Sequence, residues 1–238
     1  MFETQIGPSG HIRGFMRPET AQGIFINFKR LLEYNNGRMP FAAAQIGLGF
    51  RNEIHPKQGL LRVREFTMAE IEHFVDPTNK DHHKFYRVKD DKLPLFTKQN
   101  QETTREIIND LTLADAVQQK VIDNETLAYF MARTYQFLVS CGIAKEAIRF
   151  RQHRDTEMAH YAQDCWDAEV ETSYGWIEIA GHADRSCYDL TKHSERTKTD
   201  LKAAKSLKEP KLVKFIRTTV DKKEVGKLFK GDAKLINE

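Results

Sequence analysis

Two long segments of alternating residues, 41–54 and 60–75, constrain the fold of this chain more than any other feature of its sequence. Side chains that point to opposite faces at every second position are typical of a β-strand. The letters between the two segments are HPKQG (55–59), whose proline and glycine favour a loop. The pattern therefore predicts two long antiparallel strands joined by a loop.

The two faces of this predicted hairpin differ in chemistry. The apolar face, which we expect to pack on a core, carries Ala42, Ala44, Ile46, Leu48 and Phe50. The opposite face has Gln45, Arg51 and Glu53 on the first strand, and Arg64, Phe66, Met68, Glu70, Glu72 and Phe74 on the second. A sheet packed on a core normally carries only solvated polar side chains on its other face. The mixed face therefore resembles the floor of a ligand site, and an exposed, charge-laced hairpin is the alternative.

The composition excludes several classes of protein. The chain has 238 residues, 40% hydrophobic and 10% aromatic, which excludes disorder throughout. No apolar run approaches the roughly 18–20 residues of a membrane span, and the first residues lack the apolar core of a secretory signal. Three cysteines without a CxxC pair favour a reducing compartment, so we expect a cytoplasmic protein that does not bind membranes. A net charge of +3 does not establish a polyanionic partner.

The rest of the sequence predicts both helices and strands. Helical spacing of apolar residues runs from Thr20 to a stop at Asn36-Gly37, and from Leu127 to a stop at Gly142. Strand patterns occupy 147–153, 160–170, 173–185 and 212–220, and some helix is expected at 105–121. We expect an α+β fold in which 1–75 and 151–198 form a core, 76–150 a partly helical insertion, and 199–238 the start of a basic insertion.

Three motifs together resemble a known family. They are RPETAQG (17–23), FRNE followed by the loop and RVREFTMAEIEHF (50–74), and YGWIEIAGHADR (174–185). An Arg-x-Glu on one strand, a loop, and Arg and Phe on the returning strand resemble motif 2 of class II aminoacyl-tRNA synthetases. With AHYAxDCWD, the motifs resemble glycyl-tRNA synthetases of the eukaryotic and archaeal type, over about 6–232.

The resemblance implies a mainly antiparallel sheet flanked by helices, with an inserted, partly helical subdomain. Motif 1, motif 3 and the anticodon-binding domain of that family have no counterpart in these 238 residues. We therefore expect a central fragment of the catalytic domain, without activity of its own. A synthetase-like module that binds or signals without catalysis is the rival hypothesis.

The family's reaction joins glycine to ATP, giving glycyl-adenylate, and then transfers glycine to tRNA(Gly). Attack of a carboxylate on the α-phosphate brings two anions together, so it requires cations and positioning more than a protein nucleophile. The resemblance makes Arg51 the catalytic clamp on the α-phosphate, because a guanidinium fork can bind the phosphate and the glycine carboxylate.

The resemblance also implies the other substrate-binding residues. ATP is expected to contact Arg51, Asn52, Glu53, Arg62, Val63, Phe66, Glu178 and Ile179, with Glu53 reading the adenine amino group, Arg62 holding the γ-phosphate and Phe66 stacking on adenine. Glu178 is expected to hold Mg²⁺ between phosphate oxygens. From alternation alone, Phe66 is equally a core residue.

Glu19 and Glu70 are the expected ligands of the glycine ammonium group. Glycine offers no side chain to read, so a site selects it by anchoring the ammonium and excluding a Cβ. Glu70 shares a strand face with Phe66, and four residues at ~3.3 Å each give a plausible span from adenine to glycine. For Glu72 the alternative of an exposed position on a wet face stays open.

The remaining expectations concern partners and metals. In the family the motif 2 loop meets the acceptor end of tRNA, which makes His55 and Lys57 candidate contacts, and the family is a homodimer. Zinc is not expected, because His182, Cys187 and His193 have the wrong spacing and lack a fourth ligand.

Overall fold

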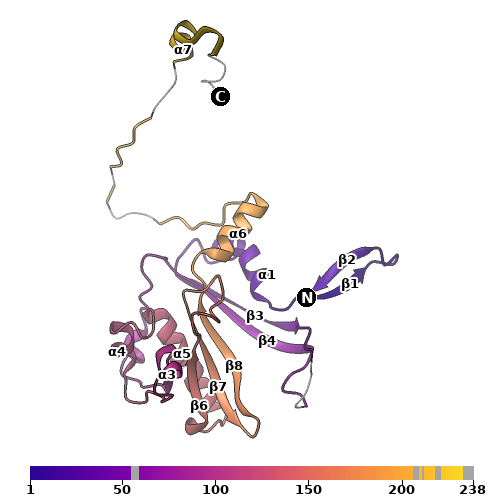
Figure 1. The fold of residues 1–238 in the computed structure, drawn as a ribbon, viewed down its shortest axis with the longest axis vertical. Coiled ribbons are helices and arrows are strands. Elements are labelled where there is room, and N and C mark those ends of the chain that lie inside the picture. The colour runs from indigo at the N-terminus through magenta and orange to yellow at the C-terminus, as the bar shows by residue number, and fades with distance from the viewer. Residues whose placement is uncertain (55–58, 206–208, 211, 218–220, 233–238) are drawn as a thin grey trace. The chain divides into compact units, whose positions relative to one another are not determined.

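The computed structural model describes residues 1–238 except 55–58, 206–208, 211, 218–220 and 233–238. The chain forms two compact units, Met1–Ala203 and Ala204–Glu238. The first unit contains β1 (Phe2–Ile6), β2 (Ile12–Met16), α1 (Ala21–Ile26), α2 (Phe28–Tyr34), β3 (Phe41–Phe50), β4 (Glu65–Phe74), β5 (Leu95–Phe96), α3 (Lys98–Glu102), α4 (Leu113–Gln118), α5 (Glu125–Ser140), β6 (Ile148–Gln152), β7 (Asp164–Thr172), β8 (Gly175–Asp184) and α6 (Tyr188–Thr197) (Figure 1). Short 3₁₀ turns lie at Phe85–Arg87 and Lys145–Ala147.

The predicted long hairpin is confirmed. β3 and β4 pair antiparallel, with Gln45 opposite Glu70 and Gly49 opposite Phe66. Residues opposite one another in an antiparallel pair share a face, so this register places the mixed residues of both strands on one side.

The face of the hairpin that packs differs from the expectation. Phe28 of α2 lies 4.9 Å, ring centre to ring centre, from Phe74 at one end of the mixed face. The apolar face expected to pack on a core is instead open, with Ile46 76% and Ile71 61% exposed. The reason is that α1 and α2, the helices next to the hairpin in the chain, place their phenylalanines on the mixed face.

A second sheet has the strand order β5-β6-β7-β8. β5 runs parallel to β6, and the other pairs are antiparallel. α5 packs on one face of this sheet, where Met131 joins Phe150 and Trp166 in a core of fully buried side chains. The strand pattern decides this arrangement, because Trp166 and Ala168 alternate with polar residues that face the other way.

α5 matches the helix predicted from apolar spacing. Its N-cap is Asn124, whose side chain accepts a hydrogen bond of 3.0 Å from the backbone N–H of Leu127. It ends just before Gly142, whose φ of +92° is the left-handed conformation that favours glycine. Residues 105–121, by contrast, are helical only in α4, because Ile108 and Thr112 form β-bridges with Leu95 and Lys92 before it and Lys120 has a positive φ after it.

The division into four parts stays a prediction, and contacts in the first unit cross the expected boundary at residue 150. The core under α5 combines Phe85, Leu113 and Ile122 from residues 76–150 with Trp166 and Ala168 of β7. The antiparallel-dominated sheets and flanking helices are nevertheless the α+β fold expected from the sequence.

In the second unit the helix α7 (Lys222–Phe229) begins at Asp221, whose side chain accepts hydrogen bonds from the N–H groups of Lys223 and Glu224. The strand expected at 212–220 is not formed by residues 212–217, and 218–220 lie outside the described residues. In the described parts of the chain, no helix combines the length and the apolar character needed to cross a membrane.

Candidate functional site

The segment before α1 lies along the edge of the hairpin. The N–H of Phe50 donates a 2.9 Å hydrogen bond to the carbonyl of Arg17, and the Arg17 side chain donates one of 2.9 Å to the carbonyl of Leu48. These bonds hold RPETAQG beside β3. Two motifs that are separated in the sequence therefore meet at one place in the fold.

Arg51 and Phe66 are brought together by the strand register. The guanidinium carbon of Arg51 lies 5.5 Å from the centre of the Phe66 ring, and its Nε donates a 3.3 Å hydrogen bond to the carbonyl of Pro18. Arg51 is exposed and Phe66 half-buried. A cation beside an accessible aromatic face can bind the anionic group of a ligand whose planar ring stacks on that face.

Glu70 is joined directly to the start of α1. Its Oε2 accepts hydrogen bonds from the N–H and hydroxyl of Thr20 and, at 2.8 Å, from the N–H of Ala21. The N–H groups at a helix start otherwise lack partners, so this carboxylate satisfies them from another strand. Sequence reasoning assigned Glu70 to a ligand alone, and only its second oxygen remains for that role.

Glu19 lies next to the same contact. Its Oε1 accepts a 2.8 Å hydrogen bond from Gln22 and lies 3.9 Å from Nη2 of Arg185. Arg185 in turn forms a two-bond ion pair with Asp189, at 2.8 and 3.0 Å. The structure thus places both Glu19 and Glu70 at the turn that begins α1.

Glu72 belongs to the same acidic group and does not lie on a wet face. Burial raises the pKa of Glu72 to about 7, Arg185 opposes the rise, and the carboxylates of Glu70, Asp189 and Glu19 add to it. We call these four carboxylates with Arg185 the acidic cluster. Four carboxylates around one guanidinium leave an excess of negative charge, which favours a cationic ligand or a proton.

Glu178 lies on β8 of the second sheet. Partial desolvation raises the pKa of this accessible carboxyl, Asp167 raises it further, and Arg51 lowers it. The pKa of Glu178 therefore responds to charges of both the hairpin and the second sheet. Its neighbour Ile179 is 44% exposed.

The other predicted ATP contacts lie where the two strands of the hairpin are joined. Asn52 and Arg62 are exposed, whereas Glu53 and Val63 are half-buried. The Glu53 carbonyl accepts a 3.1 Å hydrogen bond from Nε of Arg64. The predicted tRNA contacts His55 and Lys57 lie outside the described residues.

Of the three residues named above for zinc, the two histidines contact other groups. His182 uses both ring nitrogens, with the Thr134 hydroxyl at 2.7 Å and the Trp166 carbonyl at 3.2 Å. Burial lowers the pKa of His182 to about 4, so its ring is neutral. His193 contacts the Gln22 side chain at 2.7 Å, and Cys187 is exposed.

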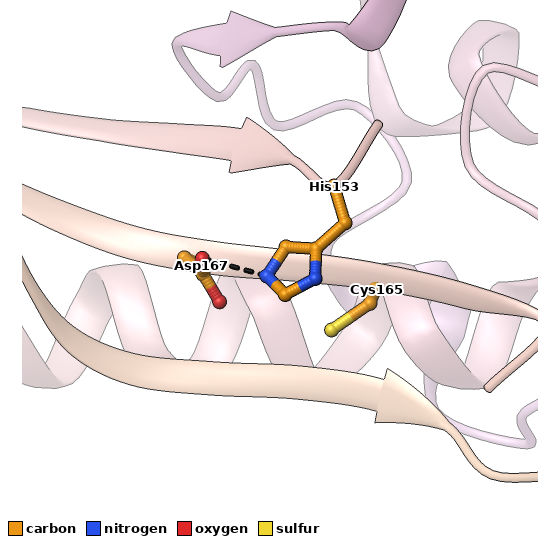
Figure 2. A group of neighbouring side chains, drawn as sticks. All are labelled: His153, Cys165 and Asp167. Carbon is orange, nitrogen blue, oxygen red and sulfur yellow. Dashed lines mark hydrogen bonds and ion pairs between the residues drawn. The ribbon is translucent and has the colours of Figure 1, made fainter. Parts of the chain in front are cut away.

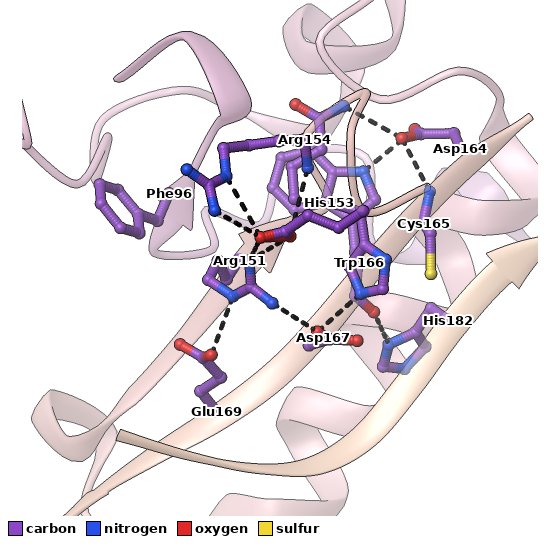
Figure 3. A network of polar contacts seen from close by, with 12 residues as sticks. Phe96, Arg151, His153, Arg154, Asp164, Cys165, Trp166, Asp167, Glu169 and His182 are labelled. Carbon is purple, nitrogen blue, oxygen red and sulfur yellow. Dashed lines mark hydrogen bonds and ion pairs between the residues drawn. The ribbon is translucent and has the colours of Figure 1, made fainter. Parts of the chain in front are cut away.

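A polar network on β6 and β7 escaped the sequence reasoning. Arg151 contacts Glu157 at 2.8 Å, Glu169 at 3.0 Å and Asp167 at 3.1 Å (Figure 3). Its members alternate along 147–153 and 164–169, a signal that could have placed them on one face.

Comparison with known proteins places these features in context. Residues 13–159 match the family model "tRNA synthetase class II core domain (G, H, P, S and T)". The chain is 59% identical to a glycine–tRNA ligase of Caenorhabditis elegans, over 99% of this chain and 32% of that protein. It is 56% identical to one of Drosophila melanogaster, over 100% of the chain and 31% of that protein. A putative glycine–tRNA ligase of Schizosaccharomyces pombe shows 55% identity, with 100% and 36% covered. The chain thus spans about a third of the length of these curated relatives.

Proposed function

The chain belongs to the class II tRNA synthetase core family, and on this premise we propose that it supplies the central part of the catalytic domain of a glycine–tRNA ligase. Such an enzyme activates glycine with ATP and transfers it to tRNA(Gly). One observation carries the proposal. Arg51 and Phe66 are neighbours on one face of the hairpin, and Glu70 lies on the same face, close to Glu19.

In the first step the glycine carboxylate attacks the α-phosphorus of ATP, a new carboxyl–phosphate bond forms, and pyrophosphate leaves. We assign Arg51 to the α-phosphate because its guanidinium is exposed. Its contacts described above, with the Pro18 carbonyl and the Phe66 ring, do not neutralise its charge. Phe66 would stack on adenine. Preorganised positive charge is worth most where negative charge develops in the transition state.

Asn52, Glu53, Arg62, Val63 and Ile179 complete the proposed ATP contacts. Their position at the open end of the hairpin supports this assignment, with Glu53 on the adenine amino group and Arg62 on the γ-phosphate.

Glu178 fits the proposed Mg²⁺ role. Its carboxylate is accessible, and the negative charge of Asp167 and the positive charge of Arg51 both act on it. Mg²⁺ is usually bound by one or two carboxylates and substrate phosphates, and when bound it would offset phosphate charge. Glu178 itself would position the phosphate chain against Arg51.

The acidic cluster suits the glycine ammonium group. The second oxygen of Glu70 and the carboxylate of Glu19 would anchor it, and the bonds from Glu70 to Thr20 and Ala21 fix the position of that oxygen. The surplus of carboxylates over Arg185 supports a cationic substrate at this point.

The proposal also covers the partners of the protein and its location in the cell. We propose His55 and Lys57 as contacts of the tRNA acceptor end, a homodimer as the working assembly, and the cytoplasm as its location. The free cysteines Cys141, Cys165 and Cys187 suit a reducing compartment.

Pyrophosphate exchange in a complete synthetase carrying this segment tests the proposed function. Glycine should drive exchange, whereas alanine and serine should not, because their Cβ must be excluded. Exchange driven equally by alanine, or none with glycine, would refute the proposal.

A further inference from the structure

The side chain of Gln22, in the first turn of α1, connects three groups from distant parts of the chain. Its Nε2 donates hydrogen bonds to Oε1 of Glu19 at 2.8 Å and to Oδ1 of Asp189 at 3.3 Å. Its Oε1 contacts Nε2 of His193 at 2.7 Å. Asp189 and His193 both lie on α6, about 170 positions further along the chain. One amide therefore joins α1 to α6 at a carboxylate of the acidic cluster.

The chemistry of these three partners decides which way the Gln22 amide points. A carboxylate accepts hydrogen bonds and cannot donate them, so the amide nitrogen must face Glu19 and Asp189. The amide oxygen then faces His193, which donates the N–H of its Nε2. The reverse orientation would bring the amide oxygen against two carboxylates. The surroundings of Gln22 therefore hold its amide in a single orientation.

Asp189 is the firm end of this arrangement. It is buried and accepts two hydrogen bonds from Arg185, at 2.8 and 3.0 Å. Burial by itself would raise the pKa of Asp189, but the hydrogen bonds from Arg185 and Gln22 hold that pKa below its ordinary value. A carboxylate that stays ionised keeps both partners. Because Arg185 is paired in this way with Asp189, and lies 3.9 Å from Glu19, it neutralises Glu19 only in part.

Gln22 fixes one oxygen of Glu19 and leaves the other for a ligand. The hydrogen bond from Gln22 and the approach of Arg185 both involve Oε1 of Glu19. A free glutamate side chain is flexible, and ordering it when a ligand binds costs conformational entropy. The bond from Gln22 orders Glu19 in advance. Its Oε2 is therefore presented beside Glu70, whose own carboxylate is fixed by the start of α1.

We propose that Gln22 is a positioning residue of the glycine site, which holds Glu19 in the orientation that binds the ammonium group. Gln22 acts through Glu19 and does not itself contact the substrate. This role rests on the proposed function, because it takes Glu19 to be a ligand of glycine. It also gives α6 a part in glycine binding, since His193 and Asp189 hold Gln22 although α6 contributes none of the proposed glycine ligands.

The kinetics of glycine-dependent pyrophosphate exchange, in a complete synthetase carrying this segment, test the role of Gln22. Gln22→Met keeps the length of the side chain and removes the amide. KM for glycine should rise about tenfold, because a hydrogen bond to a charged group is lost. KM for ATP and kcat should change by less than about twofold, since the ammonium group keeps its contact with Glu19 from the bound substrate to the transition state. A merely structural role would lower kcat through the fraction of active enzyme and leave KM for glycine unchanged.

Two further variants separate positioning from a general effect on the fold. In a Glu19→Ala background, Gln22→Met should raise KM for glycine by less than about twofold more, because Gln22 then has no carboxylate to position. Gln101→Met is the matched control. The Gln101 amide donates hydrogen bonds to the carbonyls of Phe96 and Gln152 in the second sheet, so its loss should affect stability and leave KM for glycine unchanged.

Circular dichroism verifies that each variant is folded. If Gln22→Met does not fold, His193→Ala decides, because it removes only the bond to the amide oxygen and should raise KM for glycine about threefold. A raised KM in Glu19→Ala beside an unchanged KM in Gln22→Met would overturn the positioning role alone, as would an equal rise in Gln101→Met. An unchanged KM in Glu19→Ala, or no glycine-dependent exchange in the unsubstituted enzyme, would refute the proposed function and the role of Gln22 with it.

Discussion

The hairpin face of β3 and β4 and the polar face of β6 and β7 both place arginines near carboxylates, but they use them differently. Arg151 contacts three carboxylates, and two of these, Asp167 and Glu169, are only 3% and 7% exposed. Arg51 is exposed and contacts a carbonyl and an aromatic ring. A charge that is neutralised within the fold stabilises it, whereas a charge without such neutralisation is available to a ligand. The comparison predicts that substitutions on the two faces affect different properties.

The largest effect is expected from Arg151→Ala. The variant removes the guanidinium from buried Asp167 and leaves Glu169 with Arg149, so the free energy of unfolding should fall by about 3–5 kcal/mol. Urea denaturation measures this. Lys98→Ala, which removes an exposed ion pair with Asp155, is the control and should change stability by less than about 1 kcal/mol. Equal losses in the two variants would contradict the distinction between the faces.

Arg51→Ala should affect activity and not stability. Loss of one preorganised cation at the reacting phosphate should lower glycine-dependent pyrophosphate exchange by about 10²–10³-fold in a complete synthetase carrying this segment. Arg13→Ala, at an exposed ion pair with Glu3 in the β1–β2 hairpin, is the control and should retain exchange. If Arg51→Ala unfolded the protein or kept full exchange, Arg51 would belong with Arg151.

Glu72 sharpens the comparison because it combines burial with excess charge. Its pKa in the folded state, about 7, exceeds the ordinary 4.5, so the folded state binds its proton more tightly. This contribution to stability is therefore complete below pH 4.5 and disappears as the pH rises through 7. Between these pH values the unsubstituted protein should lose of the order of 2 kcal/mol in its free energy of unfolding through this group. Glu72→Gln should remove that loss. Denaturation at pH 5 and pH 8 gives the measurement, and an unchanged pH dependence in the variant would contradict the acidic cluster.

A smaller effect is expected at the start of α5, which is distant from ligand chemistry. Asn124→Ala removes the cap on Leu127 and a 2.8 Å hydrogen bond to Asp184, and should lower stability by about 1–2 kcal/mol. Asn109→Ala removes only an exposed 3.3 Å bond to the Ile107 carbonyl and should be close to neutral in thermal unfolding. If the two variants matched, the cap would contribute nothing measurable.

The sequence predicted the parts of this molecule that depend on local periodicity. Alternation gave the hairpin and the shared face of Arg51 and Phe66, and apolar spacing with Gly142 gave α5 and its end. These features depend on which side chains, among residues close in the sequence, lie on the same face of a strand or helix. Assigning roles to Glu19 and Glu70 required, in addition, resemblance to a family.

What the sequence could not show depends on contacts between distant segments. The bonds from Glu70 to Thr20 and Ala21 join residues about fifty positions apart, and Arg185 approaches Glu19 from beyond the end of β8. The alternation of residues in the hairpin could not show which of its faces is packed, because Phe25 and Phe28, which cover that face, belong to the preceding helices. His153 and Cys165 become neighbours only through the register of β6 and β7 (Figure 2).

The central claim is that Arg51, Phe66, Glu19 and Glu70 form one adenylate site. Thermal unfolding of the chain with and without a non-hydrolysable glycyl-adenylate analogue tests it directly. At a ligand concentration of 100 times Kd, binding should raise the free energy of unfolding by about 2.7 kcal/mol, and Arg51→Ala should abolish most of this gain. An absence of stabilisation at saturating analogue, or the same gain in Arg51→Ala, would contradict the account.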